Sequence, residues 1–190
     1  MFDIDGKNVE KSEESIDLLI NNSIPESIHG IDVSEQKKKK GKYNSKGKVL
    51  AVCISEKKGE QKHIVEEVEL KENWGIVGDA HAGEWHRQVS LLAKESVLKL
   101  QKKISFELHP GNFAENILIE GLLITELPVG TYLRIGEALT EITQIGKECH
   151  NSCPIREATG DCIMPKEGIF VKVIESGHVV AGDAIEIIEK

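Results

Sequence analysis

Residues 128–146 read PVGTYLRIGEALTEITQIG, and this stretch decides the fold class. It contains two short runs rich in branched residues, at 131–135 and 139–145, with a glycine turn between them. Similar runs, with glycines between many of them, recur at residues 49–55, 63–70, 88–92, 114–119, 169–174 and 184–188. In this part of the chain, residues 93–103 alone have the composition of a clear helix. The pattern predicts a mainly β fold, either a barrel or a sandwich.

The beginning of the chain has a different composition. Residues 1–48 carry nine basic and nine acidic side chains, so the net charge of −8 belongs to the rest of the chain. The stretch KKKKGKYNSKG at 37–47 is typical of a solvated linker, and contact of its lysines with RNA or acidic lipid is the alternative. We expect an extension with one short helix at residues 1–46 and a folded domain at 47–190.

Composition and charge exclude several classes of protein. An acidic chain lacks the basic face that nucleic-acid binding needs. No apolar run approaches the roughly 20 residues that span a bilayer, and no signal peptide precedes the first polar residues. We therefore expect a soluble, cytoplasmic protein without nucleic-acid or membrane partners. In that compartment, clustered cysteines are more often metal ligands or reactive thiols than disulfides.

The glycine-rich segment GIVGDAHAGEWHRQ at residues 75–88 gathers polar chemistry. Arg87 is a candidate for binding a phosphate or carboxylate, because a guanidinium can form two parallel hydrogen bonds. The spacing of Asp79, His81 and His86 allows a metal site, although it matches no known closed motif. The alternative is a structural loop whose histidines pair with the backbone.

A second segment, HPGNFAEN at residues 109–116, combines a turn with the start of a strand. Asn116 is interpreted as a strand-end cap. If its side chain instead faces a cavity, the amide can bind the donor and acceptor edge of a heterocycle.

A third segment, GKECHNSCPIR at residues 146–156, is the most specific. Cys153 lies between a turn-prone Asn-Ser pair and a proline, and Lys147, His150 and Arg156 favour its thiolate form, which attacks electrophiles or ligates soft metals. One alternative is a zinc site made by Cys149, Cys153, Cys162 and a histidine, although the usual C-x2-C spacing is missing. Another is that the thiols are small buried apolar residues, which suits Cys53 best.

Together these segments resemble the MOSC domain, a family found at the C-terminus of molybdenum-cofactor sulfurases. The family also includes the mitochondrial amidoxime-reducing components and small stand-alone bacterial proteins. The resemblance covers residues 47–189 and rests on motifs in family order: GDAHAG at 78–83, RQVSLL at 87–92, GNFAEN at 111–116, EGL at 120–122, LPVG at 127–130, CHNSC at 149–153 and GD at 182–183.

The resemblance implies a β-rich barrel with a few flanking helices that binds a molybdenum-pterin cofactor or handles its sulfur. By this resemblance Cys153 is the reactive cysteine, which ligates molybdenum or carries a persulfide. Asn116 lies near the cofactor pocket, Arg87 binds the cofactor's phosphate or a substrate anion, and His81 is a further cofactor-binding residue. Cys149, His150 and Cys162 belong to a pattern seen in a subset of the small proteins, and we expect Cys149 and His150 beside the cofactor.

The expected function is therefore that of a molybdenum-cofactor-binding or sulfur-carrier domain, whose partners are the cofactor and its biosynthetic or recipient enzymes. One alternative is a molybdenum-dependent reductase of N-hydroxylated substrates, which needs an external reductase because the chain has no flavin or iron–sulfur motif. The other is a non-catalytic, zinc-stabilised docking domain. No pyridoxal phosphate is expected, since nothing resembles the lysine site of the sulfurases' neighbouring domain. Residues 12–33 faintly resemble the closing helix and tail of molybdopterin-adenylyltransferase-type domains; the alternative is a frayed extension.

Overall fold

A computed structural model describes residues 45–148, 154–160 and 162–188 of the chain. Cys149, His150 and Cys153 lie outside these residues. The strands are β1 (Lys46–Ile54), β2 (His63–Val65), β3 (Glu67–Lys71), β4 (Gly75–Ile76), β5 (Val89–Ala93), β6 (Ile117–Glu120), β7 (Tyr132–Ile135), β8 (Ala138–Ile145), β9 (Ile169–Glu175), β10 (Gly177–Val180) and β11 (Ala184–Ile188). The helices are α2 (Lys94–Gln101), α3 (Pro154–Thr159) and α4 (Met164–Glu167), with a 3-10 turn, η3, at Ile124–Glu126.

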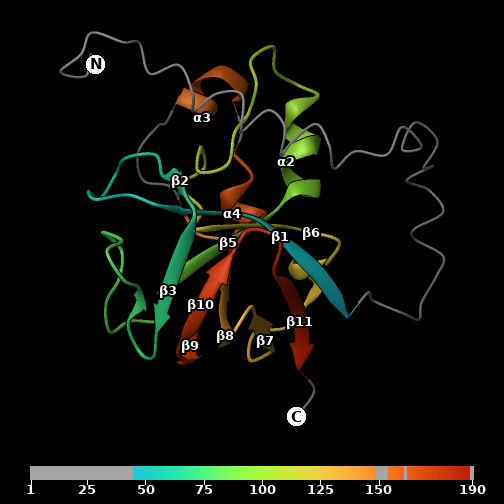
Figure 1. Cartoon of the computed structure of the whole chain (residues 1–190). Helices are drawn as coiled ribbons and strands as arrows, with labels where there is room; N and C mark the ends of the chain where they lie inside the picture. Colours follow the sequence, from blue (N-terminus) through green and yellow to red (C-terminus); the bar gives the residue numbers. More distant parts are fainter. Residues whose placement is uncertain (1–44, 149–153, 161, 189–190) are drawn as a thin grey trace, which may run out of the picture. The chain divides into compact units, whose positions relative to one another are not determined.

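Seven of the strands close into a barrel. The order is β11-β7-β8-β9-β5-β6-β1, and pairing of β1 with β11 completes the ring. β2 pairs with the C-terminal end of β1. All the pairings in the ring are antiparallel except that of β5 with β6, which is parallel. The expected mainly β barrel with a few helices is confirmed, and closure excludes the sandwich (Figure 1).

The alternating sequence of β8 shows why these residues form a barrel wall. Ala138, Thr140 and Ile142 are buried, while the residues between them are partly exposed. Successive side chains of a strand point to opposite faces, so one face of β8 lines the interior of the barrel. That interior is filled by branched side chains from every strand of the ring.

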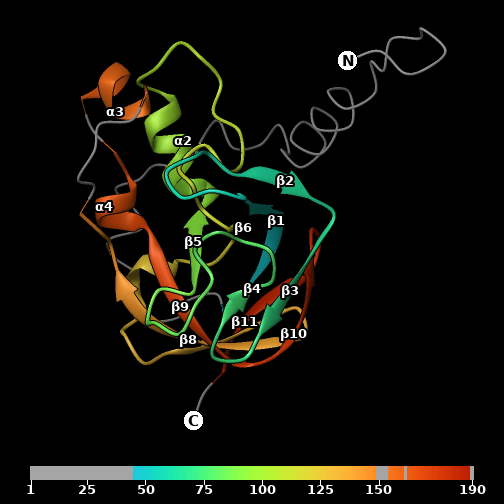
Figure 2. The same cartoon turned by 90° about the vertical axis from the view of Figure 1, so that its left-hand side faces the viewer.

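The wall formed by β5, β6 and β1 is apolar on both of its faces. Val89 and Leu91 belong to the interior cluster, whereas Leu92 packs with Leu100 of α2 and Met164 of α4 in a second apolar cluster. Figures 1 and 2 both show the helices gathered over one end of the barrel. A strand that is buried on both faces is expected to read as a continuous apolar run, as β5 does.

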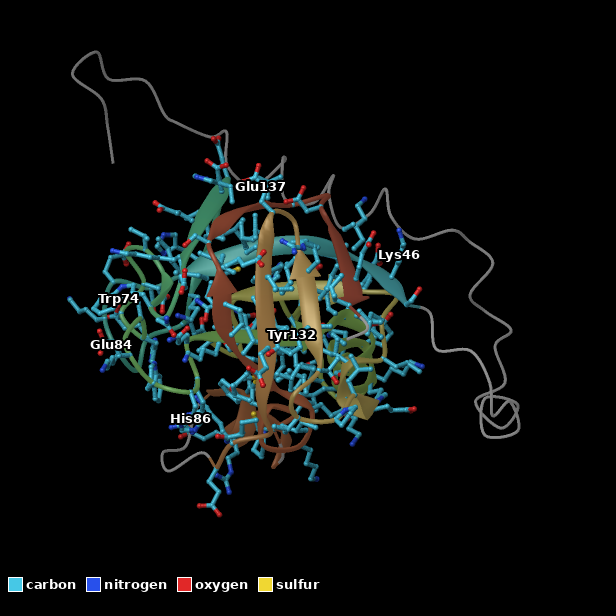
Figure 3. The ribbon with its side chains drawn as sticks, turned by 90° about the horizontal axis from the view of Figure 1, so that it is seen from below. Lys46, Trp74, Glu84, His86, Tyr132 and Glu137 are labelled. Carbon is cyan, nitrogen blue, oxygen red and sulfur yellow. The ribbon has the colours of Figure 1, made fainter. Side chains whose placement is uncertain are left out.

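The remaining strands form a small separate sheet. Its order is β10-β3-β4, and β10 pairs with β3 in antiparallel register from Gly177 opposite Leu70 to Val180 opposite Glu67. Figure 3 shows Trp74 and Glu84, from the loops after β3 and β4, on one flank of the barrel, with Lys46 on the opposite flank. The small sheet thus carries the glycine-rich segment.

Some expected boundaries are wrong. The expected strand at 63–70 is two strands, β2 and β3, which lie in different sheets. The expected strand at 114–119 begins only at Ile117, because Ala114 adopts φ +60° and residues 109–114 form a turn. In the described part of the chain, no helix is long and apolar enough to cross a membrane.

Candidate functional site

The glycine-rich segment between β4 and β5 contains a buried carboxylate, that of Asp79. Gly78 has φ +85°, a conformation that residues with a side chain rarely adopt, and the chain turns inward after it. Oδ2 of Asp79 accepts the backbone N–H of Ser55 at 3.0 Å, and Oδ1 accepts that of His81 at 2.9 Å. A buried carboxylate therefore fixes the segment to the end of β1.

The charged partner of Asp79 is Lys62, a residue that no sequence motif singled out. Its Nζ contacts Oδ2 of Asp79, and only 1% of either side chain is exposed. Burial by itself raises the pKa of Asp79, but its contacts with His81 and Lys62 and the positive charge of Lys62 outweigh this effect and hold the pKa below its ordinary range. The two residues form an internal ion pair.

The turn at residues 109–114 packs against the backbone of Lys62. The N–H of Lys62 donates to the carbonyl of Gly111 at 3.1 Å. Glu115, which is fully buried, accepts the N–H groups of Gly111 at 2.6 Å and Phe113 at 3.1 Å, and so closes the turn. Burial raises the pKa of Glu115 to about 7, against the opposing effects of these hydrogen bonds and of the Lys62 charge.

Asn116 joins three strands of the barrel wall. Oδ1 of Asn116 accepts hydrogen bonds from the N–H of Ser90 at 3.1 Å and from the Ser90 hydroxyl at 2.9 Å. Nδ2 of Asn116 donates to the carbonyl of Cys53 at 3.1 Å. The residue is 2% exposed. Both ends of the amide are therefore used to connect β5, β6 and β1, and Asn116 positions the strand that follows Arg87.

His81 lies at the surface end of the ion pair. Its Nδ1 is 3.4 Å from Nζ of Lys62 and 3.5 Å from Oδ1 of Asp79, and 30% of the side chain is exposed. Its carbonyl accepts the indole N–H of Trp85 at 3.0 Å. His81 is thus connected through Trp85 to the neighbourhood of Arg87.

Arg87 lies between two aromatic rings. Its Cζ is 4.9 Å from the ring centroid of Trp85 and 5.8 Å from that of Phe170. Its Nε is buried and has no hydrogen-bond partner among the described residues. Stacking on aromatic faces fixes a guanidinium while leaving its N–H groups available, which suits the binding of an anion.

A second cation reaches the same phenylalanine. Nζ of Lys147, two residues before Cys149, lies 5.9 Å from the ring centroid of Phe170. The two segments are fastened together, because Nε2 of His86 lies 2.9 Å from Oε1 of Gln144 and the Thr143 hydroxyl donates to the carbonyl of His86. The structure therefore gathers Arg87 and Lys147 at the start of the segment that carries Cys149, His150 and Cys153.

The other two cysteines are buried among apolar side chains. Cys53 and Cys162 both belong to the cluster under the helices. Burial, together with the charge of Glu115, raises the pKa of the Cys53 thiol well above its ordinary value. Within the described residues, no group of three His, Cys, Asp or Glu side chains could hold a metal ion. His81 and His86 therefore do not join Asp79 in the metal site that their spacing allowed, since His86 is paired with Gln144.

Comparison with known proteins assigns the chain to a family. Residues 78–186 match the sequence profile of the MOSC domain. No curated protein matches the chain. The fold is shared with solved structures whose sequences are distant. YuaD of Bacillus subtilis has a TM-score of 0.64 and 19% identity, over 75% of this chain and 95% of that one. YiiM of Escherichia coli has a TM-score of 0.57 and 22% identity, over 76% of this chain and 70% of that one. YiiM of Geobacillus stearothermophilus has a TM-score of 0.58 and 16% identity, over 75% of each chain.

Proposed function

The chain belongs to the MOSC domain family, which is associated with molybdenum-cofactor-related function, and on this basis we propose that it binds a molybdenum-pterin cofactor or carries sulfur for one. Cys153 is the proposed reactive thiol, as a molybdenum ligand or as the carrier of a persulfide. Cys149 and His150, in the same segment, are proposed to lie beside the cofactor.

The observation that carries the proposal is the pair of cations on Phe170. A large anionic ligand needs positive charge and N–H donors at a fixed place, and Arg87 offers a buried Nε–H that has no acceptor among the described residues. Lys147 adds a second charge next to the cysteine segment. The donor set therefore fits an anionic group, and a soft thiolate such as that proposed for Cys153 suits molybdenum–sulfur chemistry.

Each residue then has a defined task. Arg87 and Lys147 bind the phosphate or another anionic part of the ligand, and Trp85 and Phe170 hold the guanidinium in place. Asn116 fixes β5, which begins two residues after Arg87. When bound, the cofactor would supply the metal centre, and Cys153 would hold it through its sulfur or carry the persulfide.

The test is combined analysis of molybdenum, oxidised-pterin fluorescence and persulfide in the full-length protein, purified without oxygen from a molybdate-fed host. We expect Cys153→Ala to lose bound molybdenum or persulfide. Arg87→Gln removes charge-assisted hydrogen bonds worth about 1.5–3 kcal/mol, so pterin affinity should fall roughly tenfold to hundredfold.

The matched controls remove a thiol and a cation elsewhere. Cys53→Ala changes a buried thiol, and Arg134→Gln changes a guanidinium on β7 that is paired with Glu175, so neither should alter the metal or pterin content. Unchanged molybdenum, pterin and persulfide in Cys153→Ala contradicts the proposal. So does stoichiometric zinc without pterin, which supports the docking domain instead.

A further inference from the structure

The ammonium group of Lys62 makes three contacts, one for each of its hydrogens. Besides Oδ2 of Asp79, its Nζ lies 3.3 Å from Oγ of Ser55 and 3.4 Å from Nδ1 of His81. A lysine ammonium has three N–H donors and no lone pair, and the group is buried, so each N–H needs an acceptor. Nδ1 of His81 is the third acceptor available.

Nδ1 of His81 also lies 3.5 Å from Oδ1 of Asp79, but both oxygens of this carboxylate have donors without the His81 ring. Its Oδ2 already accepts from Lys62 and from the N–H of Ser55, and its Oδ1 accepts from the backbone N–H of His81. A hydrogen on Nδ1 of His81 would face an ammonium and leave the third N–H of Lys62 buried without an acceptor, which is costly. The contacts therefore favour a lone pair on Nδ1.

We infer that Lys62 is a positioning residue that holds His81 as the neutral tautomer with its hydrogen on Nε2, so that the ring offers an N–H donor to an anionic ligand. Nε2 has no partner among the described residues, and the side chain is 30% exposed. A nitrogen that carries this hydrogen has no lone pair for a metal, so His81 binds oxygen atoms of a ligand rather than the metal itself. The nature of the ligand rests on the proposed function, whereas the tautomer does not.

The test is a long-range ¹H–¹⁵N spectrum of the histidine rings in the ¹⁵N-labelled full-length protein at neutral pH. The chain has seven histidines, and His81→Gln identifies the signals of His81 by their loss. We expect a pyridine-type Nδ1 and a pyrrole-type Nε2. In folded Lys62→Met, the pyridine-type signal of Nδ1 should disappear, because the freed nitrogen takes a hydrogen and faces Oδ1 of Asp79.

The matched control is Lys94→Met, which breaks the ion pair of Lys94 with Glu120 and should leave the His81 signals unchanged. A pyrrole-type Nδ1 in the wild type overturns the inference, and this measurement decides the matter even if Lys62→Met does not fold. An unchanged His81 spectrum in folded Lys62→Met also overturns it.

Inorganic phosphate serves as the probe of the donor role. Its addition should move the Nε2 and Nε2–H signals of His81 in the wild type and not in Arg87→Gln, where the anion is no longer held nearby. No shift at millimolar phosphate overturns the donor role. These spectra need no bound cofactor, so their failure is distinguishable from loss of molybdenum or pterin in the Cys153→Ala test.

Discussion

At the scale of single residues, two buried carboxyl groups near Lys62 respond to pH in opposite directions. Asp79 is held ionised, so the stability it provides is present above its ordinary pKa and is lost as pH falls below it. The pKa of Glu115 is raised from 4.5 to about 7, so its contribution is complete below pH 4.5 and is lost as pH rises through about 7. The domain should therefore lose stability at both ends of this range.

Glu115→Gln tests the second effect. Because the folded state holds the Glu115 proton more tightly than the unfolded state between pH 4.5 and 7, the wild type loses about 3 kcal/mol of unfolding free energy across that interval through this group. The variant has no proton to lose, so its stability relative to the wild type should improve by about that amount from pH 4.5 to pH 8. Urea denaturation at several pH values measures the difference.

A suitable control is Glu69→Gln, which neutralises an exposed carboxylate on β3 and should show no such trend. Parallel pH profiles for the wild type and Glu115→Gln would mean that Glu115 titrates in the folded protein as it does in the unfolded chain.

At the scale of elements, the close approach of the 109–114 turn to Lys62 depends on Gly111. Its φ is +88°, and an added Cβ would lie 2.1 Å from the carbonyl oxygen of Lys62. Gly111→Ala should therefore lower the unfolding free energy by roughly 3 kcal/mol or more, from backbone strain and overlap together. Thermal and urea unfolding measure the loss.

Gly59 provides the comparison, because it has nearly the same φ, +85°, with nothing within 4 Å of an added Cβ. Gly59→Ala should lower the unfolding free energy only by the backbone strain, about 1–2 kcal/mol. Equal losses in the two variants would show that the contact of Gly111 with Lys62 does not limit the packing of the turn.

The strands and helices also show which elements the sequence patterns could predict. Residues 184–188 were predicted as a strand and form β11, because four of the five residues are apolar and Gly182 precedes them. β10 was not predicted, since four residues beginning with a glycine give too little periodicity. α4 was missed for a similar reason, being only four residues long. Patterns within one segment therefore located the strands of the barrel but not these short elements outside it.

The same limit applies to the candidate site. The motifs singled out His81, Arg87 and Asn116, and Asn116 was interpreted as a strand-end cap, but they gave no reason to expect that its amide connects two other strands of the wall. Lys62 could not be found, because it lies in a polar stretch and becomes buried only through a partner seventeen positions away. Contacts between separate segments decide such roles, and one sequence does not record them.

At the scale of the whole molecule, the part of the chain that the structure describes supplies two extensive apolar clusters, whose members lie from residue 49 onward. We therefore predict that deleting residues 1–44 leaves the fold intact, with an unfolding midpoint within about 2 °C of the full-length value, since 1 kcal/mol shifts a domain of this size by a few degrees. Differential scanning calorimetry of both proteins provides the measurement. A fall of more than about 5 °C would mean that the extension stabilises the domain.

The ring of strands is sealed by its first and last members, with Lys46 opposite Glu186. During synthesis on a ribosome, β1 emerges early and must wait for β11, which is made after more than a hundred intervening residues. Until then the first strand has an open edge, and open edges invite pairing with other chains. The nascent protein should thus depend on chaperones until its final strand leaves the exit tunnel.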